Sequence, residues 1–479
     1  MQAVVRYGLM ILFAAVVFLL IRTRGESLVA PVSAAVATVE PAATHNVFLR
    51  VLMALSAIIA LGQLLTRLLA YVSQPPVIGE VLAGIMLGPS LLGPDVSALI
   101  LPTTAAAALG VIGQLGIVLY MFLVGLELNP ALLRHRIHST VATSHASILL
   151  PFLLGSLLAL FLYPRLSTSD VPFTHFALFV GVAMSVTAFP VLARVLADHK
   201  LTRSNLGVVA LSCAAVDDVT AWCLLAVVIG IANTDIGRGL LVAAGAVAFI
   251  ALMFLVARPF FARIAGDREA EQPSKVVMTV MFLALLVSAM ATEAIGIHAI
   301  FGAFLLGTVI PHDSVAARSI RGQAEGVVSI LLLPAFFALT GMRTRIDLLS
   351  EPSQWVMCGL IILVATAGKF GGTLIAGRIT GLRWRSATIL GALMNSRGLM
   401  ELVVLNVGLD FGIISPTVFT MMVLMALVTT ALTCPVLRLL QVRDVDSTLL
   451  PEPPRNTAEP LQCVAAHPAG QSEEPTVPR

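Results

Sequence analysis

The sequence predicts an all-α polytopic membrane protein, in which about thirteen core transmembrane helices form two inverted repeats with broken crossing helices. Three observations predict this fold class. Of the 479 residues, 58% are hydrophobic and only 11% are charged, which is too apolar for a soluble domain. Apolar segments of about 20 residues, long enough to span a bilayer, recur along the chain. Two of these segments contain helix breakers at corresponding places in the two halves of the chain.

The first apolar segment, residues 4–21, precedes the core helices. Arg6 before it and the alanine-rich stretch 33–37 after it are features of a secretory signal peptide. Arg22 and Arg24, which follow the apolar run directly, suit a cleavage region poorly. We therefore favour a retained extra helix that starts in the cytoplasm, with a cleaved signal as the alternative, and assign residues 1–44 to this segment and a linker.

Thirteen more apolar segments lie between residues 45 and 440, which we assign as the transmembrane domain and number as core helices 1 to 13. They are centred on residues 47–72, 76–93, 105–126, 138–163, 174–198, 205–232, 238–260, 275–294, 296–311, 324–342, 354–378, 385–409 and 415–440. The remaining residues, 441–479, are polar and rich in Pro and Glu, which predicts a short disordered tail.

The basic residues of the loops predict the orientation of the helices. Most of them follow odd-numbered core helices: Arg134, Arg136, Arg194, Lys200, Arg203, Arg258, Arg263, Arg268, Lys275, Arg318, Arg321, Arg378, Arg383, Arg385, Arg438 and Arg443. The loops on the other side contain about four, which are Arg165, Arg238, Arg343 and Arg345. The positive-inside rule therefore places the C-terminus in the cytoplasm and the start of core helix 1 outside.

Several classes of protein are disfavoured by the composition. The net charge is only +3 and the basic residues are spread over the loops, so nothing indicates a nucleic-acid partner. The five cysteines have no CxxC or His-rich spacing, and no GxGxxG motif follows a predicted strand, so we expect no disulfide framework, transition-metal site or cofactor. An intramembrane aspartyl protease needs two facing acids, whereas the adjacent Asp217 and Asp218 point about 100° apart on one helix. We do not expect an enzyme.

Ionisable residues inside predicted helices are the candidates for function, because a charge at the bilayer centre costs about 2.5–3.5 kcal/mol on insertion scales. They are Glu80, Glu127, Asp217, Asp218, Glu293, Lys369, Arg397 and Glu401. Lys369 is the only one of three lysines that lies in the middle of a helix, and an ammonium, unlike a guanidinium, can lose its proton there. Arg397 and Glu401 lie one turn apart, and with Glu80 and Glu127 they form a candidate supporting charge network, either structural or gating.

Two core helices contain breakers near their middle. Pro190 interrupts core helix 5, and Gly398 interrupts core helix 12 beside Arg397. These helices occupy corresponding places in core helices 1–6 and 8–13, and the intervening helix 7 inverts the second half. Broken helices at matching places in two inverted halves point to an ion site near the bilayer midplane.

Six motifs carry a family resemblance: "QPPVIGEVLAGIMLGPSLLG", "FLVGLELNPALL", "SVTAFPVLARVLAD", "AAVDDVTAWCLLA", "IGIHAIFGAFLLG" and "NSRGLMELVVLNVG". Together they resemble the monovalent cation:proton antiporter-2 family, in its sodium/hydrogen exchanger transmembrane domain, from about residue 47 to 440. The resemblance implies a homodimer. It also implies that core helices 1–3 and 8–10 hold still while core helices 4–6 and 11–13 move against them.

The resemblance also implies roles for particular residues. Asp218 matches the principal carboxylate for cation and protons, and Asp217 matches the neighbouring acid that forms a salt bridge with a core lysine, here Lys369. Thr187 and Pro190 match the unwound part of core helix 5. Members with paired aspartates are generally electrogenic, so the resemblance implies exchange of more than one proton per cation. The "GMRTRID" motif departs from the family pattern, because an arginine at 343 replaces the lysine expected from plant relatives.

The sequence thus predicts a secondary active antiporter that exchanges a monovalent cation for protons by alternating access. The acid pair favours Na+ over K+, and a K+/H+ antiporter or an ion sensor without transport are the alternatives. A channel is disfavoured, because broken helices in inverted halves favour alternating access. Three lysines against 26 arginines indicate a GC-rich bacterial genome, and hence the inner (plasma) membrane of a bacterial cell.

Overall fold

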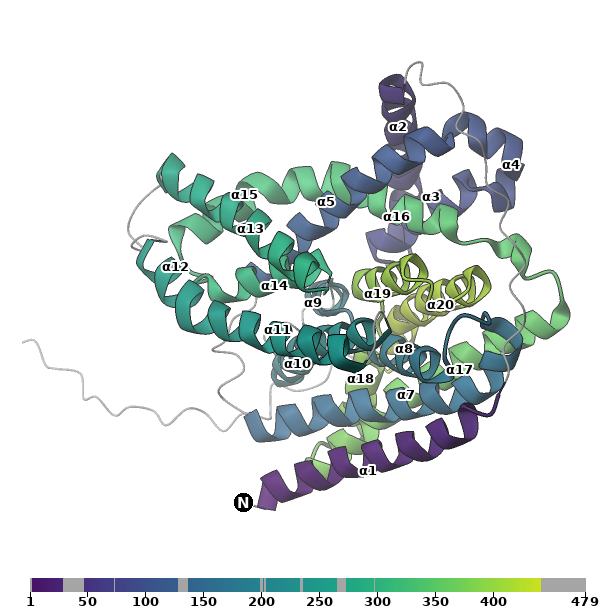
Figure 1. Ribbon diagram of the computed structural model, residues 1–479, viewed down its shortest axis with the longest axis vertical. Coiled ribbons are helices and arrows are strands. Elements are labelled where there is room, and N and C mark those ends of the chain that lie inside the picture. The colour runs from purple at the N-terminus through teal and green to yellow at the C-terminus, as the bar shows by residue number, and fades with distance from the viewer. Residues whose placement is uncertain are drawn as a thin grey trace, which may run out of the picture. The chain divides into compact units, whose positions relative to one another are not determined.

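The computed structural model describes residues 2–28, 47–72, 74–127, 137–198, 201, 204–232, 236–264, 273–296 and 298–440. The chain divides into two units, Met1–Val445 and Asp446–Arg479. The second unit lies outside the described residues, as does the tail predicted at 441–479. In the part of the chain that the structure describes, every regular element is a helix (Figure 1).

The first half of the chain contains one interrupted helix and one π-helical turn. Its helices are α1 (Gln2–Gly25), α2 (Val47–Ala70), α3 (Pro76–Leu87), α4 (Pro89–Ile100), α5 (Thr103–Glu127), α7 (Ile137–Leu166), α8 (Phe173–Ser185), α9 (Phe189–Asp198) and α10 (Asn205–Ala232). α11 (Ile236–Leu252) then continues through a π-helical turn (Met253–Ala257) into α12 (Arg258–Ile264).

The second half contains another π-helical turn and another broken helix. Its helices are α13 (Lys275–Ile295), α14 (Ala299–Val309), α15 (Val315–Val327), α16 (Leu333–Arg343), α17 (Pro352–Ile379), α18 (Trp384–Met394), α19 (Leu399–Asp410) and α20 (Pro416–Leu439). The π-helical turn Val328–Leu332 joins α15 to α16, and a 3₁₀ turn, Ile346–Leu348, follows α16.

The protein is a multi-pass helical membrane protein, although the predicted count of thirteen core spans is not confirmed. Within the described residues, ten helices, α1 included, are long and apolar enough to cross a bilayer, or eleven if the bent pair α3 and α4 forms one span. The predicted core helices 2, 5, 9 and 12 are absent from the ten because they are short or interrupted. They correspond to α3, to α8 with α9, to α14, and to α18 with α19.

Core helix 2 differs from the expected continuous helix over 76–93. α3 ends at Leu87, Gly88 is extended, and α4 leaves at an angle of 67°. Pro89 cannot continue the hydrogen bonds of α3 but fits the first turn of α4. Inside α4, Gly93 adopts a positive φ of 79° that only glycine reaches easily, which allows a second kink just before Pro94.

Small residues hold neighbouring helices together at close range. Apolar helices gain no hydrophobic driving force from contact inside lipid, so they associate where backbones can approach. A Cβ atom on Gly125 of α5 would lie 2.9 Å from the Cα of Gly307 in α14. A Cβ atom on Gly84 of α3 would lie 2.7 Å from the Cα of Ala338 in α16. Larger side chains at these glycines would push α14 away from α5, and α16 away from α3.

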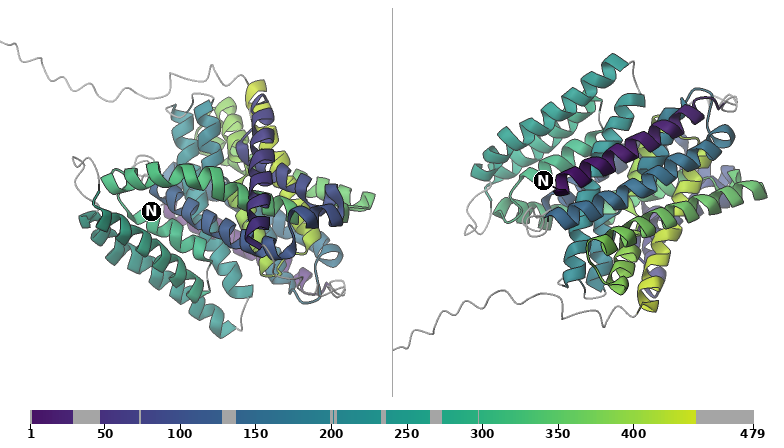
Figure 2. Two further views of the ribbon diagram at one scale, coloured as in Figure 1. Left: turned by 90° about the horizontal axis from the view of Figure 1, so that it is seen from above. Right: turned by 90° about the horizontal axis from the view of Figure 1, so that it is seen from below.

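The first apolar segment forms α1, which packs along α7 and against α8 (Figure 2). The rings of Phe18 and Phe152 lie 5.8 Å apart between α1 and α7. Just after α1, Glu26 Oε1 accepts hydrogen bonds from Arg22 Nε at 2.7 Å and from Thr174 Oγ1 at 3.2 Å. These contacts support a retained helix, which stays our prediction.

Candidate functional site

Two helices are interrupted at their middle, and their unwound segments meet. Residues 186–188 separate α8 from α9, and residues 395–398 separate α18 from α19. The backbone N–H of Ala188 donates to the carbonyl of Ser396 at 3.3 Å, so the two breaks are in direct contact. Four helix ends therefore converge, and each brings backbone groups that have no partner within its own helix.

The sequence explains both breaks. Pro190 is the second residue of α9, and because it has no N–H it cannot bond the carbonyl of residue 186, which lies in the unwound segment. Gly398 precedes α19 in an extended conformation. A Cβ atom there would lie 2.6 Å from Val191 Cγ2, so glycine lets α9 approach the second break. The predicted breakers therefore lie at the starts of the second half-helices.

Asp217, on α10, is buried and fully partnered. Its Oδ2 lies 2.8 Å from Lys369 Nζ and accepts hydrogen bonds from Thr187 Oγ1 at 2.8 Å and from Ser147 Oγ at 3.1 Å. Its Oδ1 accepts from Ser144 Oγ at 2.5 Å. Both side chains of the ion pair have no exposed surface. The charge of Asp217 is therefore balanced and its oxygens are occupied.

Asp218 is the opposite case. Its side chain is only 2% exposed, and neither carboxylate oxygen has a side-chain hydrogen-bond partner among the described residues. The backbone N–H of Phe189, where α9 begins, and the charge of Lys369 act on this carboxylate. The N-terminus of a helix favours a nearby anion. A buried carboxylate with unused oxygens needs a neutralising proton or cation, because an isolated buried charge is very costly.

Cationic side chains from the second half close the end of α8. Lys369 Nζ donates to the carbonyl of Ser185 at 2.6 Å. Arg397 donates through Nη1 to the carbonyl of Ala183 at 3.0 Å and through Nη2 to that of Met184 at 2.6 Å. The last carbonyls of a helix lack intrahelical donors and carry partial negative charge. Lys369 and Arg397 therefore supply both the missing donors and the matching charge.

The four residues predicted as a supporting charge network lie in three separate surroundings. Arg397 Nη1 contacts Glu401 Oε2 at 2.8 Å, and both side chains are fully buried. Glu127, at the end of α5, lies 3.8 Å from Arg321, and Glu80 lines a cavity beside α2. The acidic side chains are thus dispersed. Within the described ranges no group of three or more His, Cys, Asp or Glu residues is placed to hold a metal ion.

Sequence reasoning missed part of the site. Ser144 and Ser147, both on α7, bind Asp217, and no motif singled them out. Their spacing of three residues, which puts both hydroxyls on one face of an apolar helix, was the available signal. Tyr120 was also missed, although it lies within electrostatic range of Asp218.

Unwound segments that cross at the middle of a multi-pass bundle, with a buried unpartnered carboxylate beside them, are the hallmarks of a secondary ion transporter. Residues 51–441 match the family model described as "Sodium/hydrogen exchanger, transmembrane". The chain belongs to the sodium/hydrogen exchanger family, and the resemblance expected from its motifs is confirmed.

Relatives of known name agree with this assignment. The chain is 43% identical over 396 residues to "Na(+)/H(+) antiporter NhaS4" of Synechocystis sp., which covers 81% of this chain and 97% of that protein. It is 37% identical to "Cation/H(+) antiporter 20" of Arabidopsis thaliana, over 79% of this chain and 47% of that protein. It is 34% identical to "K(+)/H(+) antiporter 1" of Saccharomyces cerevisiae, over 76% of this chain and 43% of that protein. The chain thus spans about half the length of the plant and yeast relatives.

A solved structure shares the fold. The sodium proton antiporter MjNhaP1 from Methanocaldococcus jannaschii superposes with a TM-score of 0.62, covering 82% of this chain and 96% of that one. The sequence identity is only 15%, so this likeness concerns the fold alone.

Proposed function

We propose that the protein is a secondary active antiporter that exchanges a monovalent cation for protons by alternating access, with Asp218 as the shared carrier. One observation carries this proposal: Asp218 is buried, with no side-chain partner among the described residues, beside the crossing of two broken helices. Asp217, its neighbour, is saturated by Lys369 and hydroxyl groups. Asp218 is therefore the carboxylate that is available to a cation or a proton, and Asp217 is the carboxylate held by fixed contacts.

Competition for the Asp218 carboxylate couples the transport of the cation to that of the proton. A carboxylate at 2% exposure is stable only when neutralised, either by a proton on one oxygen or by a bound cation. The two states exclude each other at a single carboxylate. If the site opens to one side of the membrane at a time, an inward proton gradient drives the cation outward.

The oxygen shell of the cation has further candidates at the crossing. Thr187 Oγ1 donates its proton to Asp217, which leaves its lone pairs free. The unwound residues 186 and 187 lie outside regular helix and offer backbone carbonyls, whereas the carbonyl of Ala188 accepts from Leu192 N at 2.9 Å. We assign Asp217, Asp218 and Thr187 to the cation and proton site on this basis.

Lys369 extends the scheme to electrogenic exchange. Its ammonium is balanced by Asp217, and a cation arriving at Asp218 brings a second positive charge close to it. Release of the Lys369 proton relieves this repulsion, so that more than one proton moves per cation.

Na+ is the first candidate cation, because the relative that is matched over 97% of its length is named a Na+/H+ antiporter. K+ is the alternative, since the yeast relative is named a K+/H+ antiporter. We further propose a homodimer in the inner membrane of a bacterial cell with a cytoplasmic C-terminus. The family resemblance supports the dimer, and the loop charges support the orientation.

Proton flux in proteoliposomes with an imposed pH gradient tests the proposal. Addition of Na+, K+ or Li+ to the wild-type protein should dissipate the gradient for at least one cation. Asp218→Asn should abolish the effect, whereas Asp170→Asn, which removes an exposed acid before α8, should not. No dissipation by any of the three cations between pH 6 and 9 would contradict antiport and favour an ion sensor.

A further inference from the structure

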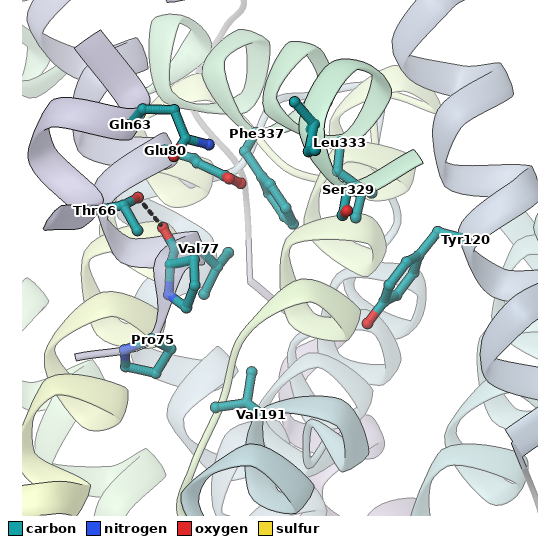
Figure 3. A pocket seen from close by; sticks show the side chains of 12 residues that line it. Gln63, Thr66, Pro75, Val77, Glu80, Tyr120, Val191, Ser329, Leu333 and Phe337 are labelled. Atoms are coloured by element: carbon teal, nitrogen blue, oxygen red, sulfur yellow. Dashed lines mark hydrogen bonds between the residues drawn. The ribbon is translucent and has the colours of Figure 1, made fainter. Parts of the chain in front are cut away.

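A cavity of about 350 Å³ lies between α2, α3, α5, α9 and the junction of α15 with α16 (Figure 3). Pro75 and Pro76, at the turn between α2 and α3, line one end. By the share of liquid volume that one water takes, the cavity holds roughly ten waters.

Among the described residues that line the cavity, Glu80 is the only one with an acidic side chain, and none is a lysine, arginine or histidine. Glu80 is only 7% exposed, and burial is the sole influence on its carboxylate that the described residues exert. Figure 3 shows it on the α3 side of the cavity, across from Tyr120 on α5. A largely buried carboxylate without a basic partner is stabilised by a bound proton or cation.

Residues with neutral oxygens line the same cavity. Thr66 Oγ1 donates to the carbonyl of Pro76 at 3.2 Å, and Ser329 Oγ donates to that of Glu325 at 2.6 Å. Each hydroxyl donates its proton to a backbone carbonyl, so its lone pairs remain available to a cation. The Gln63 side chain adds an amide oxygen. Carboxylate and neutral oxygens are the ligands of hard monovalent and divalent cations.

The π-helical turn Val328–Leu332 is part of the same wall. Ser329 and Ile330, both in this turn, line the cavity, and the extra residue of a π-helical turn displaces its side chains from the regular α-helical positions. Such turns occur often at functional sites. The turn therefore brings Ser329 to the cavity where a regular helix would place it differently.

We propose that this cavity is a second binding site for a monovalent cation, with the Glu80 carboxylate as its charged ligand and oxygens from α2 and the π-helical turn as neutral ligands. The cavity reaches α9 beside the first break. Tyr120 lines the cavity and is within electrostatic range of Asp218, and Val191 lines it from α9, close to the break before Phe189. A cation held at Glu80 is thereby concentrated next to the exchange site.

This proposal rests on the proposed function only for its effect on transport, so binding is measured separately. Purified Asp218→Asn protein, which lacks the exchange carboxylate, is equilibrated with ²²Na+ or with ⁸⁶Rb+ as a substitute for K+. It should retain weak binding of one of the two ions. Glu80→Gln on that background should remove the residual binding, and Glu80→Asp should keep it, because the charge remains.

In the otherwise wild-type protein, Glu80→Gln should raise the KM for the cation about tenfold. The charge of a carboxylate about 3 Å from the cation gives this factor at the dielectric constant of water, about 80. The maximal rate should change less than the KM. Asp95→Asn, which removes an exposed acid on α4, should leave the KM unchanged. Ser329→Ala, at an exposed residue, should weaken binding about threefold and provides a test if Glu80→Gln fails to fold.

The outcomes separate the two hypotheses. Absence of binding to the Asp218→Asn protein, or equal binding with and without Glu80→Gln, would overturn the second site. A wild-type protein that shows no exchange, but whose residual binding depends on Glu80, would refute the antiporter and leave the second site standing.

Discussion

Replacing Lys369 by methionine removes the charge that balances Asp217 and keeps the length of the side chain. The two groups lie 2.8 Å apart and neither has exposed surface. Removing one partner of such a buried pair costs about 3–5 kcal/mol, because the remaining charge is left without compensation. Unfolding entropy of about 2.1 cal/mol/K per residue, over about 400 residues, gives roughly 0.8 kcal/mol/K. Lys369→Met should therefore lower the melting temperature by about 4–6 °C.

Thermal unfolding in detergent, followed by fluorescence at one scan rate, measures this change. The double variant Asp217→Asn/Lys369→Met should regain more than half of the loss, because it leaves no isolated charge. Lys275→Met, at the exposed start of α13, is the matched control and should melt like the wild type. The reasoning is refuted if Lys369→Met melts within 1 °C of the wild type, or if the double variant loses the sum of the two single losses.

Two further predictions concern contacts away from the site. Arg343 Nη1 lies 2.8 Å from Asp410 Oδ1 and joins α16 to α19, with both side chains nearly half exposed. Arg343→Gln should change the exchange rate at least about twofold if α16 and α19 separate during transport. The melting temperature should hardly change, since exposed ion pairs add little stability. An unchanged exchange rate would show that the two helices do not separate. The hydrogen bond from Arg22 is the largest cause that holds the pKa of Glu26 below its usual 4.5. The stabilising effect of the ionised Glu26 is therefore complete above about pH 4.5 and is lost as the pH falls through the lowered pKa. Between pH 5 and 3 the melting temperature of the wild type should fall further than that of Glu26→Gln. Equal falls would contradict this.

The positions of most helices could be predicted because hydropathy and breakers act locally. Pro190 and Gly398 marked the two interruptions, and both lie beside unwound segments. The bend between α3 and α4 was missed, although Gly88 and Pro89 signalled it. An apolar window averages across such a break, and the hydropathy of residues 76–93 alone does not reveal it.

The different roles of Asp217 and Asp218 could not be predicted from spacing. They are chemically identical neighbours, and what separates them is that Ser144 and Ser147 on α7 lie against one and not the other. Contacts between distant segments decide this, and the carrier role that the family resemblance implies for Asp218 stays a prediction. Glu80 was singled out from the sequence as a buried charge, but the cavity around it could not be predicted. That cavity depends on the packing of five helical segments.

The closure of α8 by Lys369 and Arg397 also imposes an order in time. Lys369 follows its acceptor Ser185 by 184 residues, and Arg397 follows Ala183 by 214. At a synthesis rate of about 5–20 residues per second, the end of α8 waits roughly 10–40 s for its donors. During that interval Asp217 has only the hydroxyl donors of the first half, and the last three carbonyls of α8 lack their cationic donors. The site is therefore complete only after the second half of the chain has been synthesised.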